Sequence, residues 1–281
     1  FVSQLAELVV RPTESQNPAR ANEMRRYLSD LLMPRLIAAG FDSEIYPNRY
    51  GNPFLVARRI EDPHLPTILG YGHGDVTRGQ EGAWHADGAP FVLRQDQDRL
   101  YGRGTADNKA QHLINIQAQE CVIAARGKLG FNAAWLIEMG EETGSPGLEA
   151  FCQENQDLLG AQVLIASDGP RLSPDVPLVF LGARGAINFT LSVELRKGAH
   201  HSGNWGGLLT DPSVILAHAL STITDARGQI QVPEWHPTSL TPDIRALIAK
   251  LPLPVGPAID RDWGDAALTP QERVYGWNAF A

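Results

Sequence analysis

Cysteine is scarce in this sequence of 281 residues, and a framework of several disulfides is excluded because only Cys121 and Cys152 are present. A basic excess is also missing, since 24 Lys and Arg face 32 Asp and Glu and the formal net charge is −8. We therefore expect neither nucleic acid nor a membrane as a partner. No apolar run reaches the ~18 residues that span a bilayer, and the first residues lack the basic leader of a signal peptide. The two cysteines favour a cytoplasmic location.

What the sequence does contain is enough apolar material for a folded core, with 43% hydrophobic and 20% charged residues. Short apolar runs alternate with stretches of helical periodicity, which predicts an α/β fold with a largely parallel sheet flanked by helices. The predicted strands are residues 54–57, 67–71, 131–139 and 162–166, and the predicted helices are 18–39, 110–125 and 148–159. We expect Pro34 to kink or interrupt the first helix.

The pattern changes near residue 184, after a short segment that contains Gly182 and Gly185. Alternating apolar residues over 187–193 predict a strand, and residues 212–226 predict a helix. We therefore expect two domains, a larger one over residues 1–183 and a smaller α+β domain over residues 184–281.

Several polar motifs follow predicted strands, at the sheet edge where the loops of an open α/β fold converge. His73 and Asp75 come directly after the strand 67–71. Residues two apart on a strand share a face, so Asp75 can bind one nitrogen of His73 and leave the other nitrogen free for a metal ion. An ordinary polar turn between glycines explains the same two residues without a metal.

Acidic residues follow at two further junctions. Asp107 lies in a glycine-rich segment that leads into a helix, where it would either bridge two cations or cap the helix N-terminus. Glu141 and Glu142 follow the apolar strand 131–139. Two adjacent acids repel each other unless a positive charge lies nearby, although a solvated acidic loop is the simpler explanation.

Asp168 belongs to an Asp-Gly-Pro turn, which by itself indicates only a turn. His200 and His201 lie in a glycine-rich loop, where they would bind a metal, donate a hydrogen bond or form a flexible turn. In combination, one histidine and several carboxylates at strand ends make an oxygen and nitrogen ligand set without thiolate. Such a set suits Zn²⁺, Mn²⁺ or Co²⁺.

In this combination the chain resembles the co-catalytic two-metal peptidases and deacylases that include carnosinase, aminoacylase, acetylornithine deacetylase and succinyl-diaminopimelate desuccinylase. It is most similar to the dipeptidase branch of that family. The matching segments are 72–75, 101–109, 138–144, 167–168 and 201–207, with Trp84 and Pro90-Phe91 between the first two. The resemblance implies that residues 1–183 form the catalytic domain, and that residues 184–281 form part of a lid or dimerisation domain.

The resemblance also implies the metal ligands. His73 and Asp168 would bind one ion, Asp107 would bridge two ions, and Glu142 would bind the second. The implied cofactors are therefore two divalent metal ions, with Zn²⁺ expected first and Mn²⁺ or Co²⁺ as alternatives. Asp75 would orient His73.

Two further roles follow from the same resemblance. Glu141 would be the general base, and His201 would reach the site of a neighbouring subunit and stabilise the oxyanion. Asn108 stands where many relatives have a second Asp, and a cis peptide bond is expected between Asp107 and Asn108.

The implied activity is hydrolysis of an amide bond in dipeptides or small peptides by a water that bridges two metal ions. A deacylase that acts on N-acyl amino acids with the same metal chemistry stays open, and so does a non-catalytic binding or dimerisation module. The family takes a further histidine ligand from a C-terminal segment, and nothing after His236 resembles that segment. We therefore expect a chain truncated within its lid, with impaired turnover, and a homodimer of the full-length protein.

Overall fold

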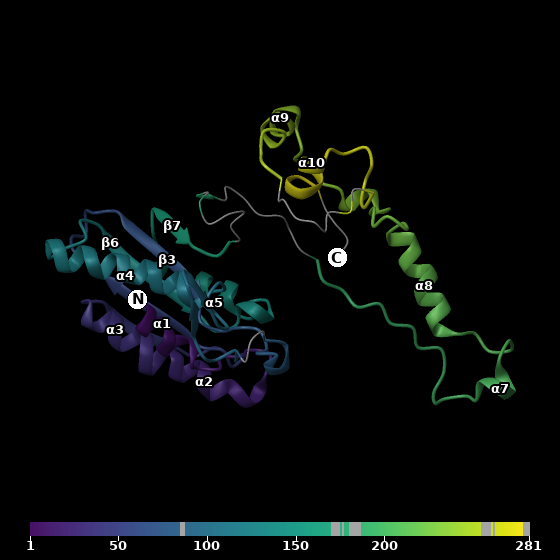
Figure 1. Cartoon of the computed structure of the whole chain (residues 1–281), viewed down its shortest axis with the longest axis horizontal. Helices are drawn as coiled ribbons and strands as arrows, with labels where there is room; N and C mark the ends of the chain where they lie inside the picture. The colour runs from purple at the N-terminus through teal and green to yellow at the C-terminus, as the bar shows by residue number, and fades with distance from the viewer. Residues whose placement is uncertain are drawn as a thin grey trace. The chain divides into compact units, whose positions relative to one another are not determined.

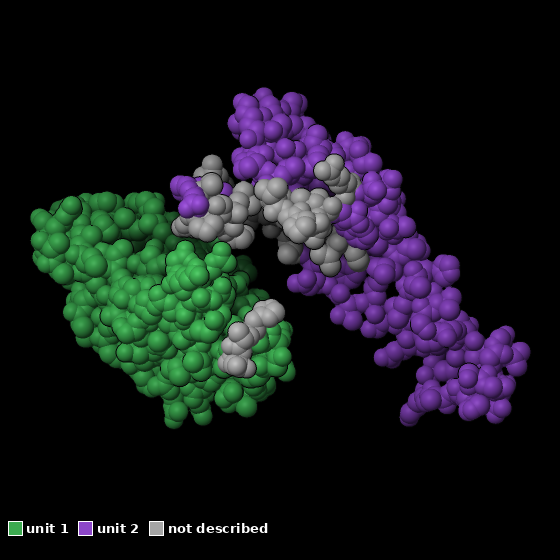
Figure 2. All heavy atoms as spheres, in the orientation of Figure 1, with its two compact units in different colours: residues 1–170 green, residues 171–281 purple. Residues whose placement is uncertain are grey.

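The computed structural model describes residues 1–84, 88–169, 175, 177–179, 187–253, 260 and 262–277. The chain divides into two units, residues 1–170 and 171–281, each of which is considered by itself (Figure 2). The expected domain boundary between residues 183 and 184 lies outside the described residues.

The described part of the first unit is built on a five-stranded sheet with the order β1-β2-β6-β3-β7. Its strands are β1 (Asp42–Tyr46), β2 (Phe54–Arg59), β3 (Thr67–His73), β6 (Asn132–Glu138) and β7 (Val163–Ala166). β2 pairs antiparallel with β1 and β6, whereas β3 pairs parallel with β6 and β7. Four of these strands therefore run in one direction, which confirms the prediction of a largely parallel sheet.

The register of the central strands decides where their loops begin. His73 at the end of β3 pairs with Glu138 at the end of β6, and Tyr71 pairs with Ala166 at the end of β7. The segments that follow these three strands therefore leave the sheet at the same edge.

Helices and short elements fill the rest of this unit. They are α1 (Val2–Val9), η1 (Pro18–Arg20), α2 (Ala21–Arg26), η2 (Tyr27–Leu32), α3 (Met33–Ala38), η3 (Glu81–Ala83), the hairpin strands β4 (Arg94–Asp96) and β5 (Arg99–Tyr101), α4 (Lys109–Arg126), η4 (Glu141–Thr143), α5 (Leu148–Glu154) and α6 (Gln156–Leu159). α4 packs along β3 (Figure 1).

Apolar side chains cover both faces of the sheet because successive residues of a strand point to opposite sides. Leu55 and Ala57 of β2 join the core cluster formed with α1, α2 and α4. Phe54 and Val56 of the same strand join a second cluster with Phe151 of α5. The sheet is therefore the middle layer between two sets of helices.

The helix predicted over 18–39 is observed as four consecutive helical segments, η1 to α3. Its η2 segment is a π-helix that ends directly before Met33, and Pro34 occupies the first turn of α3. Proline has no N–H to donate to the carbonyl four residues earlier, so a wider turn before it accommodates the missing hydrogen bond. The expected interruption is thus found.

The second unit contains α7 (Ser202–Trp205), α8 (Pro212–Ile223), η5 (Pro233–Trp235), α9 (Pro242–Ile248) and α10 (Pro270–Tyr275). α8 confirms the predicted helix, but the prediction of a strand over 187–193 is wrong. Residues 187–195 form no strand, and the apolar side chains of Ile187 and Phe189 are exposed. Strand formation requires a neighbouring strand for the backbone to pair with, and the described residues supply none here. No helix in the described part of the chain is both long and apolar enough to cross a bilayer.

Candidate metal centre

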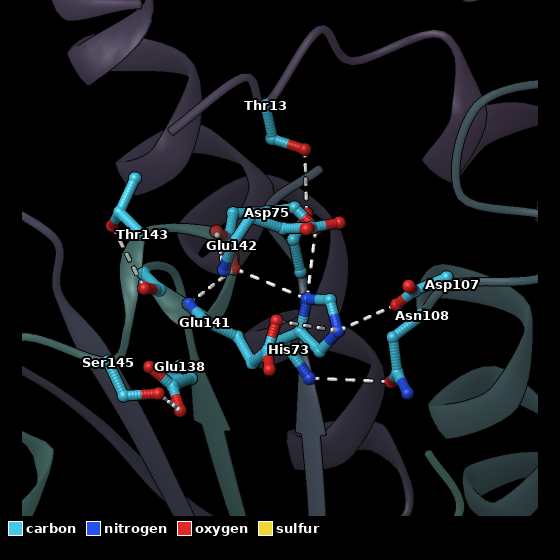
Figure 3. Close-up of polar contacts among 12 residues, drawn as sticks. Thr13, His73, Asp75, Asp107, Asn108, Glu138, Glu141, Glu142, Thr143 and Ser145 are labelled. Atoms are coloured by element: carbon cyan, nitrogen blue, oxygen red, sulfur yellow. Dashed lines mark hydrogen bonds and ion pairs between the residues drawn. The ribbon is translucent and has the colours of Figure 1, made fainter. Parts of the chain in front are cut away.

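His73 is fully buried at the end of β3, with carboxylates on both sides of its imidazole ring (Figure 3). Nδ1 of His73 lies 3.3 Å from Oδ1 of Asp75 and 3.1 Å from the backbone oxygen of Asp75. Both of these neighbours are acceptors, so they hold a proton on Nδ1. Nε2 is therefore the nitrogen that a metal ion would bind in place of a proton.

Nε2 of His73 faces a group of carboxylate oxygens. It lies 2.9 Å from Oδ1 of Asp107 and 3.4 Å from Oδ2 of Asp168, and Oε2 of Glu141 is 3.8 Å away. Nε2 is buried, and none of the described residues gives it a hydrogen bond of good geometry.

One ligand atom from each of His73, Asp107 and Asp168 lies within 4.8 Å of the others. An imidazole nitrogen and two carboxylates at this separation match the donors that hold Zn²⁺ and similar divalent ions. The residues present therefore fit a metal ion.

The charges of the cluster favour a cation as well. Burial lowers the pKa of His73, but the nearby carboxylates of Asp107, Asp168 and Asp75 more than offset this effect and raise the pKa to about 12. The close approach of the His73 ring in turn lowers the pKa of Asp168. A site that holds a proton so tightly favours positive charge at this point, and a divalent ion supplies that charge equally well.

Asp75 connects His73 to the pair of glutamates. Its two carboxylate oxygens accept hydrogen bonds from the backbone N–H groups of Glu141 and Glu142, each at 3.2 Å. Burial raises the pKa of Glu141, and the carboxylates of Asp168 and Asp75 raise it further against the opposing effect of His73. A carboxylate of raised pKa beside a metal site is suited to general-base chemistry.

Asp107 and Glu142 are close enough to influence each other. Burial raises the pKa of Glu142, and the negative charge of Asp107 adds to this increase. Glu142 is not a member of the three-residue group that the described part of the chain forms. The peptide bond between Asp107 and Asn108 is cis, as expected. Asp107 does not cap α4, because the N-cap residue is Asn108 and no side chain caps this helix.

His201 lies in the second unit as the N-cap residue of α7. Its Nδ1 accepts a hydrogen bond from the N–H of Gly203 at 3.1 Å. The neutral ring therefore carries its proton on Nε2, which makes this exposed side chain a hydrogen-bond donor. The reach of His201 to a catalytic site stays a prediction.

The aromatic segment between the first two motifs packs around Gly79. Nε1 of Trp84 donates to the backbone oxygen of Gly79 at 2.7 Å. A Cβ on Gly79 would lie 2.9 Å from Pro90 and 3.0 Å from Phe91, so glycine is needed for this close approach.

Sequence reasoning did not single out three buried residues behind the cluster, which are Tyr27, Lys109 and His112. Nζ of Lys109 donates to the backbone oxygens of Leu8 and Arg11, and burial lowers the pKa of Lys109 to about 7. His112 lies one helical turn after Asn108, which directly follows Asp107. The sequence signal that could have identified His112 is its position on the apolar face of α4.

Comparison with known proteins extends the description of the site. Residues 69–271 match the profile of Peptidase family M20/M25/M40, a range that includes every residue of the cluster. Beta-Ala-His dipeptidase of Rattus norvegicus is 35% identical over 184 residues, which cover 64% of this chain and 37% of that protein. A Cys-Gly metallodipeptidase of Candida albicans is 33% identical over 191 residues, which cover 64% and 38% of the two chains. The matched segments thus span well under half the length of these curated relatives.

A solved structure agrees with the sequence matches. The crystal structure of human carnosine dipeptidase 1 superposes with a TM-score of 0.71 at 26% identity, covering 90% of this chain and 56% of that one.

Proposed function

The chain belongs to Peptidase family M20/M25/M40, and from this we propose that it hydrolyses the amide bond of dipeptides or other small peptides with the help of two divalent metal ions. The observation that carries the proposal is the buried Nε2 of His73, which has carboxylate oxygens of Asp107 and Asp168 at 2.9 and 3.4 Å. The names of the relatives support dipeptides as the substrate class.

The ligands follow from the cluster. His73 and Asp168 would hold one ion, Asp107 would bridge two ions, and Glu142 would hold the second. Zn²⁺ is the ion we propose, because imidazole and carboxylate donors without thiolate suit it, and Mn²⁺ or Co²⁺ are the alternatives. When bound, such ions lower the pKa of a water molecule and polarise the substrate carbonyl.

The remaining chemistry falls to side chains of the chain itself. Glu141 would take the proton of the attacking water and return it to the leaving amine. Asp75 would fix the tautomer of His73, and it would also fix the backbone position of Glu141 and Glu142. His201 would donate from Nε2 to the oxyanion that forms on the substrate carbonyl. We place this donor at the site of a neighbouring subunit, in a homodimer of the full-length protein.

We also propose that the protein is located in the cytoplasm. Cys121 and Cys152 are both free cysteines, and unpaired thiols are typical of the cytoplasm.

Substrate comparison tests the proposal. The protein loaded with Zn²⁺, Mn²⁺ or Co²⁺ is given β-Ala-His and Cys-Gly, and in parallel N-acetyl and N-succinyl amino acids. Faster turnover of the unblocked dipeptides is the expected result. Preference for the acylated substrates would show the deacylase instead, and a chain that binds no metal would show a non-catalytic module.

A further inference from the structure

The side-chain amide of Asn108 contacts two other strand-end segments of the cluster. Its Oδ1 accepts a hydrogen bond from the backbone N–H of His73 at 3.4 Å. Its Nδ2 donates to the backbone oxygen of Ser167 at 3.1 Å. Asn108 directly follows Asp107, and Ser167 directly precedes Asp168. One amide therefore links the three segments that carry the proposed ligands of the first ion.

The orientation of this amide is fixed by its partners. A backbone N–H only donates and a backbone oxygen only accepts, so Oδ1 must face His73 and Nδ2 must face Ser167. A carboxylate at position 108 would retain the acceptor but would bring an oxygen against the oxygen of Ser167.

A buried pair supports the amide from behind. Nδ1 of His112 lies 3.2 Å from Oδ1 of Asn108, and Nε2 of His112 lies 2.8 Å from the hydroxyl of Tyr27. Burial lowers the pKa of His112 to about 3. The ring is therefore neutral, donates through Nδ1 to Asn108 and accepts from Tyr27 through Nε2. Asn108 and His112 are 1% and 0% exposed, so water does not compete for these hydrogen bonds.

Gly72 provides the space for this arrangement. A Cβ at position 72 would lie 2.7 Å from Cβ of His112 and 3.1 Å from Oδ1 of Asn108. The close approach of β3 to the start of α4 therefore requires glycine at this position.

We propose that Asn108 is a positioning residue of the metal site, whose amide holds the segments of His73, Asp107 and Asp168 at the separation that a divalent ion needs. The inference rests on the proposed metal site and goes beyond it by naming the residue that sets the spacing of the ligands. Residues that orient metal ligands without touching the ion commonly change metal affinity by about 10- to 100-fold when they are substituted.

The test uses the full chain with Asn108→Ala, Asn108→Asp and, as a matched control, Asn132→Ala. Asn132 is also buried and begins β6, at the end of that strand opposite to the cluster. It accepts from the N–H groups of Glu61 and Asp62 and donates to the oxygens of Asp62 and Leu65. It therefore reports the general cost of losing a buried asparagine.

Two readouts are taken for each variant. Amide hydrogen exchange of the metal-free protein reports whether residues 72–74 and 167–169 remain held, and competition with a chromogenic chelator gives the affinity for Zn²⁺. Asn108→Ala should speed exchange in both segments and weaken Zn²⁺ binding by about 10- to 100-fold. Asn108→Asp, which preserves the side-chain volume, should speed exchange mainly at 167–169. Asn132→Ala should leave the exchange of both segments and the Zn²⁺ affinity unchanged.

Unchanged exchange at 72–74 and 167–169 in both Asn108 variants would overturn the proposal, as would a loss of Zn²⁺ affinity in Asn132→Ala equal to that in Asn108→Ala. A parent chain that binds no Zn²⁺ would overturn the proposed function. In that event the exchange of the metal-free variants still decides whether Asn108 holds the segments together.

Discussion

Oδ1 of Asp75 lies 3.3 Å from Nδ1 of His73, and both side chains are completely buried. The same carboxylate accepts the backbone N–H groups of Glu141 and Glu142. One buried acid thus fixes the orientation of a proposed metal ligand and the position of the proposed general base together. Because the two contacts share a single carboxylate, a shift of either segment disturbs the other.

The proposal gives Glu141 the role of general base and Glu142 the role of metal ligand, and substitutions at these two positions test whether the roles are separate. Glu141→Gln removes the proton acceptor but no proposed ligand, so hydrolysis should fall by roughly 10²- to 10⁴-fold while the metal content remains near that of the parent. Glu142→Gln is the matched control, since it should lose metal as well as activity. Elemental analysis alongside dipeptide hydrolysis gives both numbers, and loss of metal in Glu141→Gln would show that the roles of the pair are misassigned.

Metal binding should stabilise the fold. A ligand that binds only the folded state adds ~2.7 kcal/mol to the unfolding free energy at a free concentration of about 100 times Kd. Urea unfolding with and without Zn²⁺ should show this increase in the parent chain and a smaller increase in His73→Ala, which lacks the imidazole ligand of the first ion. Equal stabilisation of parent and variant would mean that Zn²⁺ binds elsewhere.

His112 makes stability depend on pH. Burial lowers its pKa to about 3 in the folded chain, from 6.5 when exposed. Between these values the unfolded chain binds one more proton, so the unfolding free energy falls by up to ~1.4 kcal/mol per unit as the pH drops. His112→Gln removes this contribution. The difference in unfolding free energy between parent and variant should be constant above pH ~7 and should become smaller as the pH falls towards ~4. A difference that stays constant over this whole pH range would contradict a neutral, buried ring of His112.

Packing between the central strands β3 and β6 offers a test that does not depend on catalysis or metal binding. Gly70 of β3 pairs with Trp135 of β6, and a Cβ at position 70 would lie 2.6 Å from the indole ring. Gly70→Ala should therefore lower the unfolding free energy by ~1–3 kcal/mol. Gly82→Ala is the control, because nothing lies within 4 Å of the Cβ it would add. Similar unfolding free energies for the two variants would show that the ring moves aside freely.

Much of the site was predictable because its residues follow the strands of one sheet. Periodicity identified the strands 67–71 and 162–166, and parallel strands bring the segments after them to a common edge. The proximity of His73 and Asp168 follows from that rule alone. Their roles as ligands remain proposals.

Other features depend on contacts that a local pattern does not contain. The hydroxyl of Tyr27 meets His112 across 85 residues of sequence, so the apolar periodicity of either helix reveals burial but not the partner. The strand predicted over 187–193 was wrong for a related reason. Periodicity describes where side chains point, whereas a strand also needs a neighbouring strand to pair with. Asn108 was noticed only as a departure from relatives, because two of its hydrogen-bond partners, His73 and Ser167, lie 35 and 59 residues away in the sequence.

Anomalous diffraction at the zinc absorption edge, from crystals of the full chain soaked in Zn²⁺, tests the metal centre most directly. We predict a peak between Nε2 of His73 and the carboxylates of Asp107 and Asp168, with a second peak between Asp107 and Glu142. Zinc peaks found only at other places, with these side chains free of metal, would contradict the account.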